Sequence, residues 1–124
     1  MKILVVDDER DIQALFEQRF RKEIRNKQVD FEFAFSGEEA LKYLDGHEHE
    51  AVLILSDINM PGMSGLELLS RFKKNHHDPP PVVMMITAYG DTGNFNTAKE
   101  LGADEFLTKP LDFTLLKQKL KINT

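Results

Sequence analysis

Five polar residues stand just after short apolar runs of the sequence, and together they have the chemistry for phosphoryl transfer. Asp7 and Asp8 follow the first run, Asp57 follows the third, Thr87 the fourth and Lys109 the fifth. Carboxylate oxygens suit a hard divalent cation such as Mg²⁺, which fills its remaining positions with water or phosphate oxygens. With an ammonium and a hydroxyl nearby, such a site neutralises phosphoryl oxygens while one carboxylate attacks in line.

Taken singly, each of these residues also suits a structural role. A carboxylate after a strand is commonly a turn former or a helix N-cap, Thr87 would suit a strand end, and Lys109 would suit a solvated tip. Their combination favours a site, because carboxylates that converge at one edge of a sheet repel one another unless a cation offsets their charge. Lys109 and a bound Mg²⁺ would each supply positive charge.

The elements that must position these residues are predicted by an alternation of apolar runs and helical patterns, which repeats five times. Such alternation is typical of an α/β fold with a parallel sheet. The expected strands are Ile3–Val6, Val29–Phe35, Ala51–Leu55, Val82–Ile86 and Glu105–Leu107. In the second of these, every other residue from 31 to 35 is Phe, and this period of two favours a place at the edge of the sheet. Ligands of such sheets bind beyond the carboxyl ends of the strands.

Helical patterns follow each expected strand. The first helix follows Asp8 and should present Leu15 and Phe16 on one apolar face, with Ile12 and Phe20. The others are expected from Ser36 to Gly46, around Leu66 to Phe72, from Asp91 to Leu101 and from Asp112 to Ile122. The fourth contains glycine and asparagine, which predicts a marginal and mobile helix. The last should turn Leu115, Leu116 and Leu120 toward the core.

Composition narrows the class of protein further. The 124 residues suit one domain, residues 1–124, and the 41% hydrophobic and 30% charged fractions are those of a globular protein. The absence of cysteine excludes disulfides and thiolate metal sites. Apolar runs of at most five residues predict no membrane insertion, and the lack of a signal peptide predicts a cytoplasmic location. The net charge of −5 argues against direct binding to nucleic acid or anionic lipid.

As a set, five segments of this sequence resemble the receiver domain of two-component response regulators. They are Asp7-Asp8, Asp57 within Ser-Asp-Ile-Asn-Met-Pro-Gly, Thr87-Ala88-Tyr89, Gly102-Ala103-Asp104 and Phe106-Leu107-Thr108-Lys109-Pro110. The resemblance covers essentially the whole chain. It implies a flavodoxin-like (βα)5 fold, with a five-stranded parallel sheet of order 2-1-3-4-5 and helices on both faces.

For the site, the resemblance implies that Asp57 is the phosphoacceptor. Its phosphoryl group would come from a phosphohistidine on a sensor histidine kinase or a phosphotransfer protein. Asp8, Asp57 and the backbone carbonyl of Asn59 would bind Mg²⁺, with Asp7 reaching it through water. Lys109 would pair with Asp57 at rest and with the phosphoryl oxygens afterwards. Such a protein catalyses only its own phosphorylation and dephosphorylation, and is not otherwise an enzyme.

The resemblance also implies a switch. Thr87 would hydrogen-bond to the phosphoryl group, Phe106 would turn inward, and Pro110 would follow a cis peptide bond. The face made by the fourth helix, the fifth strand and the fifth helix would then change its contacts with a downstream protein, an output domain or a second copy of the chain. The sequence departs from the usual family pattern at Phe106, which replaces a Tyr, at Ser56, which replaces an aliphatic residue, and at Pro79 to Pro81, which add prolines before the fourth strand.

Three alternatives stay open at this point. The chain could be the N-terminal receiver of a larger regulator with a DNA-binding or enzymatic output, rather than a regulator that acts alone by protein contact. A Mg²⁺-dependent phosphohydrolase would need a second carboxylate two residues after its nucleophile, where Asn59 stands. A nucleotide or flavin module would need a glycine- or hydroxyl-rich phosphate loop after the first strand, where the sequence has acidic residues.

Overall fold

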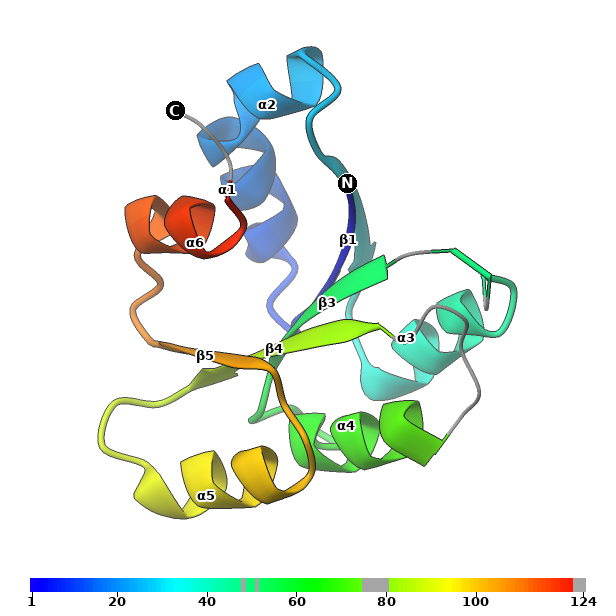
Figure 1. Ribbon diagram of the computed structural model, residues 1–124, viewed down its shortest axis with the longest axis vertical. Coiled ribbons are helices and arrows are strands. Elements are labelled where there is room, and N and C mark those ends of the chain that lie inside the picture. Colours follow the sequence, from blue (N-terminus) through cyan, green and yellow to red (C-terminus); the bar gives the residue numbers. More distant parts are fainter. Residues whose placement is uncertain (48, 51, 75–80, 122–124) are drawn as a thin grey trace.

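A five-stranded parallel sheet forms the centre of the computed structural model, which describes residues 1–47, 49–50, 52–74 and 81–121 (Figure 1). The strands are β1 (Lys2–Val6), β2 (Asp30–Ala34), β3 (Val52–Asp57), β4 (Val82–Thr87) and β5 (Glu105–Thr108). Their order is β2-β1-β3-β4-β5, and every neighbouring pair is parallel. The predicted order is therefore confirmed, as is the edge position of the strand with alternating Phe.

Helices cover both faces of this sheet (Figure 1). They are α1 (Asp11–Arg19), α2 (Arg21–Arg25), α3 (Gly37–Leu44), α4 (Gly65–Lys74), α5 (Thr92–Glu100) and α6 (Phe113–Lys119). The helices α3, α4 and α5 pack on one face, while α1 and α6 pack on the other. None of the described helices combines the length and apolarity needed to cross a lipid bilayer. Ala51 and Ile122, which we expected at an end of a strand and of a helix, lie outside the described residues.

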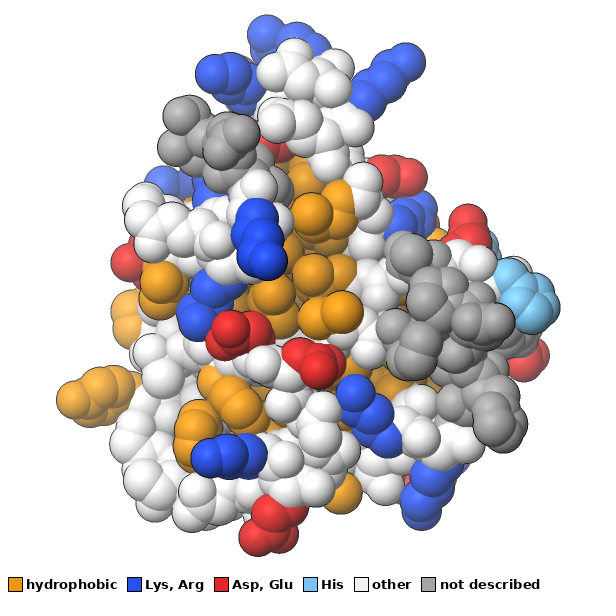
Figure 2. Space-filling model, viewed as in Figure 1, with side chains coloured by type: hydrophobic (Ala, Val, Ile, Leu, Met, Phe, Trp, Pro, Cys, Tyr) orange, Lys and Arg blue, Asp and Glu red, His pale blue; other side chains and the backbone are white. Residues whose placement is uncertain are grey.

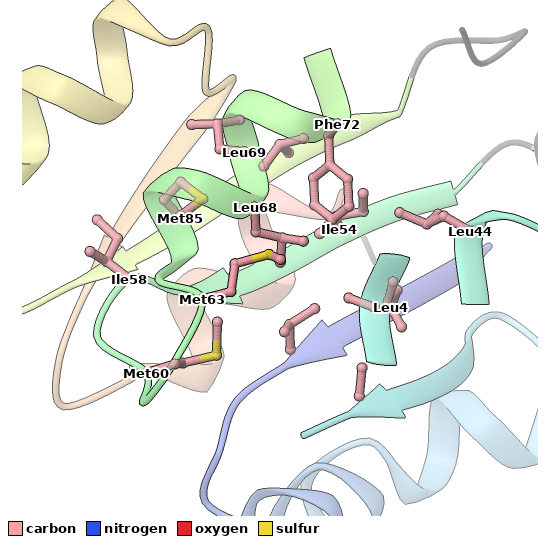
Figure 3. Packing of buried hydrophobic residues seen from close by; sticks show 14 of the residues in the cluster. Leu4, Leu44, Ile54, Ile58, Met60, Met63, Leu68, Leu69, Phe72 and Met85 are labelled. Atoms are coloured by element: carbon pink, nitrogen blue, oxygen red, sulfur yellow. The ribbon is translucent and has the colours of Figure 1, made fainter. Parts of the chain in front are cut away.

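Alternation along β1 explains why the strand is apolar from Ile3 to Val6. Leu4 and Val6 point into the core under α3 and α4, whereas Ile3 and Val5 point into the core under α1 and α6. Because successive side chains of a strand face opposite sides of a sheet, a strand buried on both faces has no polar position. Figure 3 shows the first of these cores, in which Phe72 of α4 lies over the sheet.

Five Phe side chains gather in the second core, on the side of the sheet covered by α1 and α6. The rings of Phe16, Phe20, Phe31, Phe33 and Phe113 lie with neighbouring centroids 5.0 to 6.2 Å apart, mostly edge to face. Edge-to-face pairs of this kind are worth about 0.5–1.5 kcal/mol each beyond the area they bury. The period-two Phe pattern of β2 thus serves to cover the sheet beside α1.

The structure differs from the sequence expectation in three details of the helices. The expected first helix is broken at Phe20, where φ is −109° and ψ is 20°, so a short second helix follows. Leu15 and Leu115 were expected to face the core, but their side chains are 37% and 41% exposed. Each precedes a fully buried residue, Phe16 or Leu116. Neighbouring residues lie about 100° apart around a helix, so only one of the two can occupy the centre of the buried stripe.

A buried ion pair fastens α2 to α6. The Nζ of Lys117 lies 3.0 Å from Oε2 of Glu23, and the two side chains are only 18% and 4% exposed. Burial alone would raise the pKa of Glu23, but the hydrogen bond and the charge of Lys117 outweigh it and hold that pKa below its usual value. Glu23 therefore favours folding while it is ionised, and this contribution is lost as the pH falls through its folded-state pKa.

We expect Lys117→Met to lower the free energy of unfolding by about 3 kcal/mol at pH 7, because it leaves the Glu23 carboxylate buried without a cation. Urea unfolding followed by circular dichroism measures the change. The matched control is Lys119→Met, since Lys119 pairs with the half-exposed Glu105 at 3.0 Å and should cost less than about 1 kcal/mol. Equal losses in the two variants, or a Lys117 penalty that does not shrink in acid, would contradict this account.

Candidate functional site

The expected site residues meet at the carboxyl edge of the sheet. Asp7 directly follows β1, Asp57 is the last residue of β3, Thr87 is the last residue of β4 and Lys109 directly follows β5. The register aligns Asp57 with Ile86 and Thr87 with Thr108, so these strand ends lie level across the sheet. The side chains come from four different strands because a parallel sheet gathers its carboxyl ends on one side.

Three carboxylates form a compact acidic cluster at this edge. Asp7, Asp8 and Asp57 each bring an oxygen within 4.8 Å of the others. Asp7 and Asp57 are 4% and 2% exposed, whereas Asp8 is exposed. Backbone amides orient the two buried groups, since the N–H of Glu9 donates to Oδ1 of Asp7 at 2.9 Å and the N–H of Asn59 donates to Oδ1 of Asp57 at 3.2 Å.

The ammonium of Lys109 offsets this negative charge. Its Nζ donates to Oδ2 of Asp57 at 2.6 Å, across 52 residues of sequence. Partial burial alone would lower the pKa of Lys109, but the hydrogen bond to Asp57 and the negative charges of Asp57 and Asp7 raise it. Lys109 is held in turn by its backbone N–H, which donates to the carbonyl of Thr87 at 2.9 Å. The peptide bond between Lys109 and Pro110 is cis, as the resemblance implied.

The pKa of the Asp7 carboxyl group is raised in this crowded site. Burial raises its pKa, and the neighbouring charge of Asp57 raises it further, while the amide of Glu9 and the charge of Lys109 act the other way. A carboxyl group whose pKa is raised by folding binds its proton more tightly in the folded chain. Stability therefore falls as the pH rises through that pKa.

The remaining expected residues extend from the cluster toward α5. Thr87 is buried, and its hydroxyl donates to the carbonyl of Leu107 over a long 3.5 Å. Phe106 is half-buried, with its ring centroid 4.4 Å from that of Phe95 on α5. Pro110 is exposed on the loop after Lys109.

Sequence reasoning did not single out Gly65, yet this residue shapes the loop that carries Asn59. Its N–H donates to the carbonyl of Ile58 at 2.8 Å. A Cβ on Gly65 would overlap the carbonyl oxygen of Asp57 and lie 2.7 Å from the Cα of Ile58. One signal in the sequence marks this place: Ser64 and Glu67 have the spacing of a helix start, and the Glu67 N–H donates to the Ser64 hydroxyl.

In metal-free protein, Asp7→Asn should raise the free energy of unfolding by roughly 1 kcal/mol at pH 7, because it removes a crowded buried charge. The amide oxygen of Asn can still accept from Glu9. The gain should vanish below pH 3.8, the ordinary pKa of the Asp carboxyl. Urea unfolding at both pH values with a chelator present measures it. Asp8→Asn, at an exposed position, is the control with a smaller gain, and a destabilised Asp7→Asn protein would contradict the interpretation.

Gly65→Ala should destabilise the protein by at least about 2 kcal/mol, because the new methyl group displaces the backbone of Asp57. Gly46→Ala is the matched control, since its Cβ would meet only the carbonyl of Tyr43, at 3.9 Å. The control should stay within about 0.5 kcal/mol of the parent chain. Urea midpoints of the two variants give the comparison, and equal midpoints would show that the close approach at Gly65 is unimportant.

Comparison with known proteins now places the chain in a family. The family model described as "Response regulator receiver domain" matches residues 3–121. The chemotaxis protein CheY1 of Helicobacter pylori is 32% identical over 122 residues, which cover 98% of this chain and 95% of that protein. The chain belongs to the response regulator receiver domains of two-component signal transduction.

Solved structures agree with this assignment. The receiver domain of NtrX from Brucella abortus is 30% identical, with a TM-score of 0.78 over 96% of this chain and 94% of that one. A response regulator receiver domain protein from Clostridium thermocellum is 28% identical, with a TM-score of 0.83 over 97% and 90% of the two chains. The predicted flavodoxin-like fold class is therefore confirmed.

The acidic cluster fits the Mg²⁺ that receiver domains generally bind. Its donor atoms are carboxylate oxygens only, which hard cations of this kind prefer. Two of the three carboxylates are buried close together. The ammonium of Lys109 offsets their repulsion at one oxygen of Asp57, and a cation placed among them would relieve it further. The donor chemistry and the charge of the cluster both suit a divalent ion.

Proposed function

We propose that this receiver domain, spanning residues 1–124, is a switch that is activated by phosphorylation of Asp57. The supporting observation is the buried carboxylate of Asp57, which lies 2.6 Å from the ammonium of Lys109 and beside Asp7 and Asp8. The phosphodonor would be a phosphohistidine of a sensor histidine kinase or of a phosphotransfer protein. The cytoplasmic location expected from the sequence belongs to this proposal.

Asp57 is arranged for nucleophilic attack on a phosphoryl group. One of its oxygens accepts from the amide of Asn59 and the other accepts from Lys109, so the carboxylate cannot rotate freely. A bond forms from an Asp57 oxygen to phosphorus while the bond from phosphorus to the donor imidazole nitrogen breaks. The electron pair of that bond returns to the imidazole, which takes up a proton. Lys109 then keeps its charge next to the oxygens of the new aspartyl phosphate.

The ligands proposed for Mg²⁺ are Asp8, Asp57 and the backbone carbonyl of Asn59, with Asp7 acting through water. When bound, the ion would neutralise charge on the phosphoryl oxygens. Asp7 is oriented for this task by the amide of Glu9, which leaves its second oxygen directed to other partners. Asp8 is exposed, so an ion bound to it would remain in contact with solvent water.

The conformational part of the proposal concerns Thr87, Phe106 and the loop at Pro110. The hydroxyl of Thr87 donates a long and weak hydrogen bond of 3.5 Å to the carbonyl of Leu107. A phosphoryl oxygen would replace this carbonyl as the acceptor at little cost. Phe106 packs on Phe95, so a movement of β5 would reach α5 directly. The face formed by α5, β5 and α6 would then change its affinity for a downstream protein, an output domain or a second copy of the chain.

The decisive experiment is intact-protein mass spectrometry after incubation with acetyl phosphate and Mg²⁺. We expect one added phosphoryl group in the parent chain and none in Asp57→Asn or in the presence of a chelator. Lys109→Met should react at least about 100-fold more slowly, because it removes the fixed charge beside the acceptor.

Two controls make a negative result informative. Lys119→Met removes a lysine that pairs with Glu105, away from the acidic cluster, and it should react at the parental rate. Beryllofluoride binding, monitored by the amide signals of Thr87 and Phe106, tests the site without a donor. A parent chain that neither takes up a phosphoryl group nor binds beryllofluoride would sink the proposal, as would an adduct that persists in Asp57→Asn.

A further inference from the structure

A strongly basic pocket lies at the end of the molecule opposite the acidic cluster. It has a volume of about 340 Å³, and its walls come from α1, α2 and α6. Five cationic side chains line it: Arg19, Arg21, Lys22, Arg25 and Lys117. Lys and Arg side chains gather over α2 in Figure 2, and Figure 1 places α2 at the far end of α1 from the turn that follows β1. We call this feature the basic pocket.

Most of the charge in the basic pocket has no carboxylate counterpart in the part of the chain that the structure describes. Among the described residues, no carboxylate lies within 4.0 Å of Arg19, Arg21, Lys22 or Arg25. The guanidinium of Arg19 stacks over the ring of Phe113 at 5.5 Å, which fixes it at the wall. In a chain with a net charge of −5, such a concentration of cations in one pocket raises a local positive potential.

A buried acceptor in the wall of the basic pocket also lacks a donor. Glu23 lines the pocket, its side chain is 4% exposed, and only its Oε2 is bonded, to Lys117. Within the described part of the chain, Oε1 of Glu23 has no hydrogen-bond partner. An unsatisfied buried acceptor costs about 1–3 kcal/mol. Because this oxygen is closed to solvent, it offers no contact to a ligand, and the cationic side chains are the groups of the basic pocket that can recognise one.

We propose that the basic pocket docks a short acidic segment of a partner protein. Carboxylates of the segment would pair with Arg21, Lys22 and Arg25, which are exposed at the pocket. Arginine binds carboxylates through two parallel hydrogen bonds, which suits an extended chain with closely spaced acidic residues. This surface is separate from the phosphorylation proposed above and does not depend on it.

Two observations favour an acidic peptide over a nucleic acid. None of the described residues that line the basic pocket is aromatic, so an unpaired base would find no ring there on which to stack. A long polyanion would also extend beyond the pocket and meet the rest of a chain that is negatively charged overall. A short acidic segment gains the local attraction and avoids that repulsion.

The position of the basic pocket has a consequence for signalling. The helix α1 starts near the carboxyl edge of the sheet and runs back along it, so α2 lies at the amino edge, away from Asp57 (Figure 1). A segment bound at α2 would leave Asp57 open to its phosphodonor. The partner would therefore bind the phosphorylated and unphosphorylated forms through the same contacts.

Fluorescence anisotropy of a short labelled polyglutamate peptide tests this surface in the full chain. We expect the parent chain to bind it more tightly than a polyglutamine peptide of equal length. Arg21→Glu with Arg25→Glu should weaken binding by about 10-fold or more. The matched control is Lys42→Glu with Lys74→Glu, which makes the same change in net charge at exposed positions of α3 and α4. It should change affinity by less than about 2-fold at 0.15 M salt.

The outcomes separate this proposal from its rivals. Peptide-induced shifts of amide signals should be confined to α1, α2 and α6. If charge reversal disturbs folding, Arg25→Gln serves as the milder variant. Equal losses in the pocket and control variants would mean that only overall charge matters, and would overturn the proposal. The proposal is also overturned if the parent chain does not bind the peptide, or if the basic pocket binds single-stranded nucleic acid and not the peptide.

Discussion

The hydrogen-bonded ion pair between Lys109 and Asp57 is the interaction on which the candidate site depends. Asp57 is 2% exposed, so water cannot stabilise its charge, and Asp7 and Asp8 lie within reach of it. Electrostatic repulsion among groups this close is strong in a poorly solvated interior. The ammonium at 2.6 Å is the described side-chain cation that balances Asp57 directly. This ion pair also explains why the three carboxylates can lie close together in the folded chain without a bound metal ion or phosphoryl group.

The geometry of this pair is set by backbone contacts that continue beyond the strand ends. The N–H of Lys109 bonds to Thr87, and the N–H of Ile58 bonds to the carbonyl of Ile86 at 3.2 Å. The close packing of Gly65 against Asp57 holds the next loop in place. The donor follows β5 and the acceptor ends β3, and β4 between them is hydrogen-bonded to both sides. In the switch that we propose, a new charge on Asp57 would act first on these strands and only then on α5.

Much of the fold and the placement of the site residues could be predicted because both follow from periodicity. The Phe pattern of β2 marked the edge strand, and unbroken apolar runs marked the strands buried on both faces. Once the sheet is parallel, its carboxyl ends lie together, so Asp7, Asp57 and Lys109 had to meet. The chemical roles of these residues came instead from the family resemblance, and they stand as proposals that the geometry supports.

What could not be predicted depends on choices between neighbouring residues and on contacts between distant helices. The hydrophobic periodicity of the sequence does not predict that Phe16 takes the core position instead of Leu15, or that the first helix breaks at Phe20. It also does not predict the ion pair between Glu23 and Lys117, since the two residues lie far apart in the sequence. Each of these features requires the aromatic packing of α1 against α6 to be known first.

Net charge says little about local charge for a related reason. A value of −5 describes the whole chain, and from it we argued only against direct binding to nucleic acid or anionic lipid. The structure shows that charge is segregated instead, with an acidic cluster at the carboxyl edge of the sheet and a basic pocket at the end that carries α2. An anionic ligand responds to the potential within about one Debye length, roughly 8 Å at physiological salt. The exclusion therefore applies to long polyanions that span the surface, and it does not extend to a short acidic segment at α2.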